Sequence, residues 1–379
     1  MKNKYINIIF SIILVITVGV ISLVVIRSHK AETIEETQPV VNELTTEELT
    51  TIRPDGFYME NNKWHYYENG ASSVRTDAVY GNINGEQGKW YLKNGAVDFS
   101  YNSLIKKEKN LWWYIKNGRV SEETDETIAL KINENFKETK NEDTFAYYGN
   151  FSLTEDEIKT IEDAVKAVEN KGHKIGFCLY DLNSLQGFSY NADEKIYSAS
   201  TLKGPYVASI VSDNNELLEK EKVRINAVLK NSSNFDYEGL RSKYGDESLV
   251  KWAEKAGSDV VIDAVRDYQF ITPRQLSDLW ISNYIFFESN ETGKKLGKLF
   301  ENPATSPINK VLSGDFVTRT KAGWVTKNNT KVTNDAGLVY VGEKVYLLCV
   351  MTTAPCDFKV VEDFITEMRS AITLYQQKQ

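Results

Sequence analysis

The stretch Tyr197-Ser-Ala-Ser-Thr-Leu-Lys203 decides the fold, because it places a serine and a lysine three residues apart at the start of an expected helix. Residues three apart on a helix share a face, so the amine of Lys203 can reach the hydroxyl of Ser200. A serine hydroxyl is a poor nucleophile until a base removes its proton, and a desolvated lysine near other cations can act as that base. The pair predicts nucleophilic catalysis, although an isolated Ser-x-x-Lys string is more often an ordinary surface feature.

Two further strings, Ser232-Ser-Asn234 and Lys321-Ala-Gly323, follow at a distance. In this order the three strings match the Ser-x-x-Lys, Ser-x-Asn and Lys-Thr-Gly signature of serine penicillin-recognising enzymes. In such an arrangement Ser232 relays a proton towards the leaving group, and Asn234 holds a substrate amide. Lys321 supplies positive charge for a substrate carboxylate, and Gly323 allows the substrate to approach the backbone closely.

Each string also has a decoy, because Ser103-Leu-Ile-Lys106, Ser212-Asp-Asn214 and Lys255-Ala-Gly257 fit the same patterns. The second decoy begins twelve residues after Ser200 on the same expected helix, which is roughly 18 Å away at a rise of 1.5 Å per residue. The third ends an expected helix at a glycine C-cap, whereas Lys321 lies among β-branched and aromatic residues typical of a strand. The first decoy, Ser103-Leu-Ile-Lys106, falls among the aromatic repeats, ahead of any catalytic domain.

Residues 150–379 resemble the class A β-lactamases and the related penicillin-binding D,D-peptidases. Besides the three strings, Phe270-Ile-Thr-Pro-Arg-Gln-Leu-Ser277 resembles the segment after the omega loop of that family, and Asn334-Asp-Ala-Gly-Leu-Val-Tyr340 resembles its strand after the third motif. The resemblance implies an oxyanion hole made of the backbone amides of Ser200 and Trp324. One such donor is typically worth roughly 10²–10³ in rate.

The pattern of this region predicts an α+β fold with one sheet built from both ends of the segment. A capping box at Thr154-x-x-Glu157 opens a helix, the middle from about 200 to 300 is mainly helical, and a last helix covers about 357–376. We expect an antiparallel sheet flanked by helices, with a helical subdomain inserted between its halves. The expected strands are 174–182, 187–190, 316–326, 335–341 and 344–352.

Two departures from the family pattern affect acylation. Ser200 and Ser232 lie only 32 residues apart, closer than in typical class A enzymes, so we expect a trimmed helical subdomain and a more open site. Ala322 replaces the usual hydroxyl residue of the third motif. This removes one hydrogen bond to a substrate carboxylate, worth roughly 1.5 kcal/mol or more if the partner is charged.

The third departure affects release of the acyl-enzyme. Class A β-lactamases carry a Glu-x-x-Leu-Asn string whose glutamate activates the deacylating water. Glu238, Glu247 and Glu254 do not lie in that context. Asp263 and Asp267 lie nearer the expected position, so each is a candidate deacylation base, provided that it is suitably placed.

The N-terminal end predicts a membrane anchor. Residues 8–26 carry no charge, and about twenty apolar residues span the hydrocarbon core of a bilayer. We expect a signal anchor over residues 1–30, in contact with the membrane through residues 5–26 and followed by an acidic linker over 31–55. Lys2 and Lys4 favour an inside N-terminus, although Arg27 and Lys30 weaken that assignment. The expectation is a single-pass protein of the cell membrane, with the bulk of the chain extracellular and facing the cell wall.

Residues 56–120 contain three aromatic units that end in glycine. The units are Lys63-Trp-His-Tyr-Tyr-Glu-Asn-Gly70, Lys89-Trp-Tyr-Leu-Lys-Asn-Gly95 and Leu111-Trp-Trp-Tyr-Ile-Lys-Asn-Gly118. Asn-Gly after an aromatic strand is a hairpin signal, and the even spacing indicates a repeat. The units resemble the cell-wall-binding repeats of Gram-positive surface proteins. Their rings hold a wall polymer by stacking or cation–π contact, or pack one hairpin onto the next, and both can hold at once.

The remaining composition excludes several function classes. The formal net charge is −8 and the pI is near 5.3, so no nucleic-acid partner is expected. His29, His65 and His173 fall at the membrane segment, in the repeats and at an expected helix end. Neither a Ser-His-Asp triad nor a zinc site is expected, and no metal or other cofactor is implied.

The three cysteines make an odd count, which cannot form a disulfide framework. Cys178 and Cys349 each lie in an apolar run typical of a strand, so we expect small buried hydrophobes there. Residues 121–150 are charged and aperiodic, and we expect a connector. It leads into a hydrolase domain over 151–379.

The leading hypothesis is an extracellular serine hydrolase that forms an acyl-enzyme at Ser200 with β-lactams or D-Ala-D-Ala-type peptides of peptidoglycan. Slow deacylation is compatible with the missing glutamate. One alternative is a D,D-peptidase or penicillin-binding protein without β-lactamase turnover. Another is a non-catalytic wall-binding protein with a vestigial hydrolase domain. The retained Ser, Lys, Ser, Asn, Lys and Gly argue against the vestigial alternative.

Overall fold

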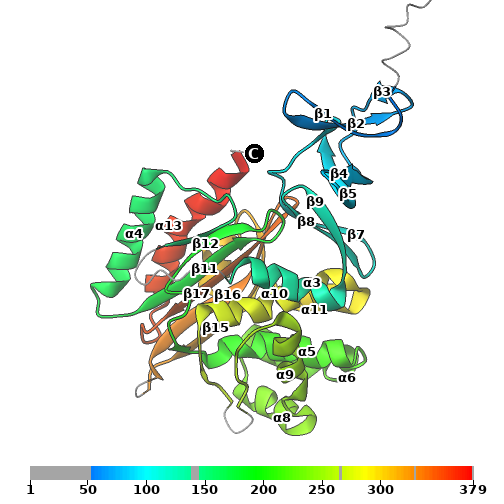
Figure 1. The fold of residues 1–379 in the computed structure, drawn as a ribbon. Coiled ribbons are helices and arrows are strands. Elements are labelled where there is room, and N and C mark those ends of the chain that lie inside the picture. The colour runs from blue at the N-terminus through cyan, green and yellow to red at the C-terminus, as the bar shows by residue number, and fades with distance from the viewer. Residues whose placement is uncertain (1–52, 138–144, 264–266, 328–329, 378–379) are drawn as a thin grey trace, which may run out of the picture. The chain divides into compact units, whose positions relative to one another are not determined.

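The computed structural model describes residues 53–137, 145–263, 267–327 and 330–377 (Figure 1). The predicted anchor over residues 1–30 and most of the acidic linker over 31–55 lie outside these residues. Among the helices that are described, none is both long and apolar enough to cross a bilayer.

The aromatic repeats form antiparallel hairpins, as the Asn-Gly signals in residues 56–120 predict. Their tight turns use asparagine and glycine in the left-handed region, as at Asn94 (φ 53°) and Gly95 (φ 77°) or Asn117 (φ 52°) and Gly118 (φ 70°). The main strand order of this sheet is β1-β2-β6-β5-β9-β8-β7, with β3 paired to β2 and β4 to β5. The strands are β1 (Gly56–Glu60), β2 (Lys63–Glu68), β3 (Ala71–Ser72), β4 (Ala78–Ile83), β5 (Glu86–Lys93), β6 (Ala96–Val97), β7 (Ser103–Glu108), β8 (Leu111–Lys116) and β9 (Arg119–Thr124).

The last hairpin packs directly on the hydrolase domain. The Leu104 amide donates to the Asn183 carbonyl at 2.6 Å, and the Trp112 indole donates to an Asp125 carboxylate oxygen at 2.6 Å. Leu104 and Trp112 are buried in the same hydrophobic core as residues of the 151–379 domain, such as Tyr284. The third repeat is therefore folded together with that domain.

The segment expected to be a connector differs from that expectation. It contains the end of β9, helix α3 (Asp125–Asn135) and strand β10 (Ala146–Tyr148). Ile128 and Ile132, one turn apart, are fully buried, and the Asn133 amide donates to the Ala256 carbonyl at 2.6 Å. The segment is rich in charged residues, so its composition alone does not reveal that the apolar positions form one face of a helix.

The hydrolase domain is built on a six-stranded antiparallel sheet in the order β10-β12-β11-β17-β16-β15. Its strands come from both ends of the segment, as predicted, although β16 begins earlier than expected. Helices α4 (Glu155–Glu169) and α13 (Phe358–Gln377) cover one face of the sheet, and α10 (Pro273–Ser289) covers the other (Figure 1). The other strands are β11 (Ile175–Asp181), β12 (Gln186–Tyr190), β15 (Val317–Val325), β16 (Val332–Val341) and β17 (Lys344–Thr352).

Short helices fill the sequence between the short strands β13 (Ile196–Tyr197) and β14 (Phe270–Ile271), which pair with each other. This is the predicted helical insertion. After the 3₁₀ turn η1 (Ala199–Leu202) come α5 (Lys203–Asp213), α6 (Leu217–Lys220), α7 (Lys222–Asn231), α8 (Asn234–Tyr244) and α9 (Glu247–Ala256). Helices α11 (Glu291–Leu299) and α12 (Pro307–Leu312) lead back to the sheet.

Two cysteines lie opposite each other in the centre of the sheet. Cys178 on β11 and Cys349 on β17 are register partners, fully buried and free. Burial raises the pKa of Cys178 to about 11 and that of Cys349 well above its ordinary value. Both thiols therefore stay protonated at neutral pH, which confirms the prediction of small buried hydrophobes.

Candidate active site

The Ser200 segment is held by two neighbouring strands. The Asn334 side-chain amide on β16 donates to the carbonyls of Tyr197 at 2.8 Å and Ser198 at 3.3 Å. On the other side, the Ser198 amide donates to the Gln269 carbonyl at 2.8 Å. Between these anchors Ala199 adopts φ 46°, which is unfavourable for a residue with a Cβ. The surrounding hydrogen bonds thus hold a strained turn that presents Ser200.

The glycine of the third motif lies directly against the nucleophile. A Cβ added to Gly323 would lie 2.5 Å from the Ser200 amide nitrogen and 2.5 Å from that of Thr201. Such a separation is shorter than a van der Waals contact, so only glycine fits between β15 and η1. The backbone at Gly323 thus runs beside the Ser200 amide, and the oxyanion hole formed by the amides of Ser200 and Trp324 stays a prediction.

Lys203 is completely buried at the start of α5. Its Nζ donates to the Ser232 carbonyl at 2.7 Å and to Asn234 Oδ1 at 2.6 Å, which brings the first and second motifs together. Burial lowers the pKa of Lys203 to about 8, against the opposing charges of Glu238 and Asp267. A substantial fraction of the amine is therefore neutral near physiological pH, as a general base must be.

Lys321 connects the third motif to the second. Its Nζ donates to Ser232 Oγ at 2.9 Å and to the Ala322 carbonyl at 2.8 Å. Burial and the positive charge of Lys203 lower the pKa of Lys321 to about 7, whereas Asp335 raises it. Ser232 itself is left-handed (φ 56°) at the junction of α7 and α8, which turns the chain sharply between them.

Asp335 is the carboxylate beneath Lys321. It is fully buried and accepts from Ser306 Oγ at 2.5 Å and from the Ile308 amide at 2.9 Å. Burial raises the pKa of Asp335 to about 7 in spite of these donors. Asp335 was not predicted as a site residue. The sequence shows an aspartate in an apolar strand, but not that Lys321 lies nearby.

The two candidate deacylation bases lie on the segment before β14. Asp267 forms an ion pair with Arg241, and nearly half of its side chain is exposed. The Asp263 amide donates to Gln269 Oε1 at 2.9 Å. The assignment of each carboxylate as deacylation base stays a prediction.

Tyr268, which was not predicted from the sequence, contacts a residue of the second motif. The Tyr268 hydroxyl donates to Asn234 Oδ1 at 3.0 Å, and Ser200 acts to lower the pKa of the phenol. Lys203 Nζ lies 5.7 Å from the centre of the Tyr268 ring. The nearest signal in the sequence is its position two residues before the Phe270 segment that resembles the family.

The three decoy strings lie in unsuitable places. Ser212 is near the end of α5, the same helix that Lys203 starts. Gly257 is the left-handed C-cap of α9 (φ 61°), and Ser103 begins a strand of the last repeat. Their positions agree with the choice made from sequence context. Among the residues that the structure describes, no cluster of three or more His, Cys, Asp or Glu side chains is arranged to hold a metal.

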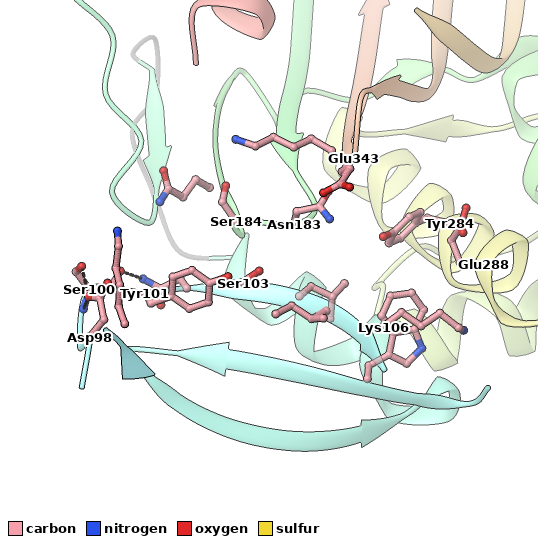
Figure 2. A pocket seen from close by; sticks show the side chains of 17 residues that line it. Asp98, Ser100, Tyr101, Ser103, Lys106, Asn183, Ser184, Tyr284, Glu288 and Glu343 are labelled. Atoms are coloured by element: carbon pink, nitrogen blue, oxygen red, sulfur yellow. Dashed lines mark hydrogen bonds between the residues drawn. The ribbon is translucent and has the colours of Figure 1, made fainter. Parts of the chain in front are cut away.

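A separate pocket lies between the last repeat and the hydrolase domain. Figure 2 shows Tyr101 and Ser103 on the repeat side, facing Asn183, Ser184 and Tyr284 of the other side. Acidic and basic side chains both line it, and none of the predicted site residues is among them. This pocket marks the repeat–enzyme junction and is distinct from the Ser200 site.

Two family models match the chain. Residues 155–244 match the Beta-lactamase enzyme family, and residues 100–121 match a choline-binding repeat. The first match covers Ser200, Lys203, Ser232 and Asn234. It confirms the predicted β-lactamase-like resemblance and indicates a serine hydrolase of the β-lactamase type. The second confirms the predicted resemblance to wall-binding repeats.

Solved structures that resemble the chain include β-lactamases and PBP-A. The β-lactamase from Sphaerobacter thermophilus DSM 20745 is 16% identical, with a TM-score of 0.47 over 57% of this chain and 97% of that one. The class A β-lactamase from Clostridium kluyveri DSM 555 is 16% identical, with a TM-score of 0.46 over 56% and 98%. A point mutant of the protein PBP-A, in an acyl-enzyme complex with penicillin G, is 14% identical, with a TM-score of 0.48 over 57% and 97%. No curated protein matches the chain.

Proposed function

From the match to the Beta-lactamase enzyme family, we propose that the chain is an acyl-transfer enzyme that forms an ester at Ser200 with β-lactams or D-Ala-D-Ala-type peptides. The observation that carries this proposal is the contact of all three motifs at one point. Lys203 reaches the second motif, Lys321 reaches Ser232, and Gly323 lies against the Ser200 amide.

The geometry supports a complete acylation step. Neutral Lys203 accepts the Ser200 proton as Oγ attacks the carbonyl carbon, and the amides of Ser200 and Trp324 stabilise the resulting oxyanion. Because Lys321 donates to Ser232 Oγ, the Ser232 hydroxyl hydrogen is available for the leaving nitrogen. Lys321 then restores that proton as the carbon–nitrogen bond breaks.

A covalent-labelling experiment tests the proposal. The protein is incubated with a fluorescent penicillin, and the adduct is measured by gel and by intact mass, with Ser200→Ala as the control. We expect a mass increase of one penicillin that maps to the peptide containing Ser200 and is absent from the control. No adduct with any of several β-lactams would reject acylation and favour the vestigial-domain alternative.

The same sample separates β-lactamase turnover from the penicillin-binding alternative. An adduct that persists for hours means that hydrolysis of the ester is slow, as expected for a D,D-peptidase or penicillin-binding protein. An adduct that disappears within seconds, with release of opened β-lactam, means efficient turnover.

We also propose that the repeats attach the enzyme to a cell-wall polymer. In the third repeat Trp112 is buried, and Lys107 Nζ lies 3.6 Å from the centre of the Trp113 ring. Packing and internal cation–π contacts therefore occupy those rings. Tyr80 on β4 is 67% exposed, so its side chain can stack on a sugar or contact a polymer cation.

Tyr80→Ala should weaken binding to purified cell walls about 2- to 5-fold, in line with about 0.5–1 kcal/mol for one exposed aromatic contact. Co-sedimentation of the extracellular chain with walls measures this. Phe235→Ala is the matched control, because Phe235 is an 81% exposed aromatic on the hydrolase domain. If both variants bind cell walls equally well, Tyr80 does not contact the polymer.

We propose that residues 8–26 anchor the chain as a single span with its bulk outside the cell. The absence of charge over these residues supports the proposal. Extraction of the full chain from washed membranes by high salt, without detergent, would contradict it.

A further inference from the structure

The backbone register places Tyr268 beside the nucleophile. Tyr197 pairs with Phe270 across β13 and β14, and Tyr268 lies two residues before Phe270, next to the Gln269 that bonds Ser198. The Gln269 amide donates to Ser198 Oγ at 3.2 Å, and the Ser198 amide donates to the Gln269 carbonyl at 2.8 Å. The position of Tyr268 is thus set by the strand that also presents Ser200.

Aromatic packing fixes the ring. Tyr268 stacks on Tyr237 with 5.6 Å between ring centres and an angle of 14°, and Tyr197 meets it edge-on at 6.4 Å. The Tyr237 hydroxyl donates to the Asp267 carbonyl at 3.4 Å, which ties the same segment to α8. The phenol is therefore held in one orientation.

The hydroxyl of Tyr268 belongs to the catalytic hydrogen-bond network. It donates to Asn234 Oδ1, the same oxygen that accepts from Lys203 Nζ. Burial raises the pKa of Tyr268, against the lowering effect of Ser200. The phenol is protonated at neutral pH, so it donates hydrogen bonds and does not accept a proton.

Hydrolysis of an ester at Ser200 has a defined proton requirement. A water oxygen bonds to the ester carbonyl carbon, the water loses a proton to a base, and Ser200 Oγ leaves and takes a proton back. A protonated phenol cannot be that base. Tyr268 places this phenol on Asn234 Oδ1 and near Lys203 Nζ.

We propose that Tyr268 prolongs the lifetime of the acyl-enzyme by placing a non-basic hydroxyl against Ser200 and Asn234. This inference rests on the proposed acylation at Ser200 and adds the identity of the residue that limits release. It favours a penicillin-binding or peptide-transfer role over β-lactam hydrolysis, because a long-lived ester can be passed to an acceptor amine.

Replacement of the phenol by a carboxylate tests the inference. The fluorescent adduct is formed, excess penicillin is removed, and adduct loss is followed with time. We expect Tyr268→Glu to shorten the adduct half-life at least about 10-fold, with a rate that rises as pH increases through the pKa of the new carboxyl, near 4–5. Tyr268→Phe should acylate and keep a half-life within about 3-fold of the parent, since neither ring is a base.

A second variant covers the possibility that Tyr268→Glu does not fold. Tyr268→Ala leaves space beside Ser200, and added formate should accelerate adduct loss in proportion to its concentration. The parent protein with the same formate is the matched control and should not respond, because the phenol occupies that space. Asp267→Asn removes the neighbouring candidate base and shows whether that carboxylate sets the parent half-life.

The outcomes separate this inference from the proposed function. Absence of any adduct on the parent would overturn the proposed function, and the inference with it. An adduct that forms and is lost within seconds would overturn the inference alone, as would a half-life lengthened by Tyr268→Phe or by Asp267→Asn. A longer half-life in Tyr268→Phe would show that the phenol assists hydrolysis. A longer half-life in Asp267→Asn would show that Asp267 is the base.

Discussion

Lys203→Ala should lower the rate of penicillin acylation by about 10²–10⁴, the range for loss of a positioned general base. Lys203 is the buried amine that contacts both Ser232 and Asn234, and its pKa is lowered to about 8. Removal of the amine leaves the Ser200 proton without an acceptor of comparable placement. Stopped-flow or gel-based labelling at several penicillin concentrations gives the acylation rate.

The pH dependence of the parent checks the same role. The amine must be neutral to accept a proton, and its neutral fraction grows as pH rises through a pKa of about 8. The acylation rate of the parent should therefore rise between about pH 6 and 7.5 and fall above about pH 8, where Lys321, whose pKa is about 7, loses the proton that it returns to Ser232. The rise should vanish in Lys203→Ala. Lys220→Ala, which changes an exposed lysine on α6, is the control. A variant that acylates at the parent rate would exclude Lys203 as the base.

Gly323→Ala is expected to damage both activity and folding. The added methyl group would lie 2.5 Å from two amide nitrogens and 2.9 Å from the Ser198 carbonyl oxygen. All three atoms belong to the backbone, so strand β15 and the Ser200 turn have to separate. We expect a fall in acylation of about 10²–10³, the value of one oxyanion donor, and a loss of about 1–3 kcal/mol in the free energy of unfolding.

Gly314→Ala is the matched control, because a Cβ at Gly314 meets no atom within 4 Å. Labelling rate and thermal unfolding should both stay close to the parent in that variant. Unchanged labelling by Gly323→Ala would mean that β15 and the nucleophile turn move apart freely, and would contradict the tight contact between them.

The motifs could be predicted from sequence because local context distinguishes strands from helices. Lys321 lies among residues that favour strands, and Lys255 lies just before the glycine that ends a helix. The order of motifs then fixed which segments meet, and the structure brings Ser200, Ser232 and Lys321 together. The strands of the catalytic sheet were also predictable, since each is a short apolar run between turn residues.

Other parts of the site could not be predicted, because they depend on pairing between distant segments. Tyr268 reaches Ser200 only through the β13–β14 register, which joins residues about 70 positions apart. Asp335 becomes notable only through its burial beside Lys321. Helix α3 was missed for a related reason, since its apolar face is recognisable only against the core that it covers.

The junction between the last hairpin and the enzyme has a consequence for where the enzyme acts. Leu104 and Trp112 belong to the same core as the catalytic half, so a polymer held by the repeats would hold the active site nearby as well. Encounter with peptides on that polymer then depends on a local effective concentration and much less on the bulk concentration. An enzyme attached in this way can process neighbouring sites in succession even when its affinity for one free peptide is low.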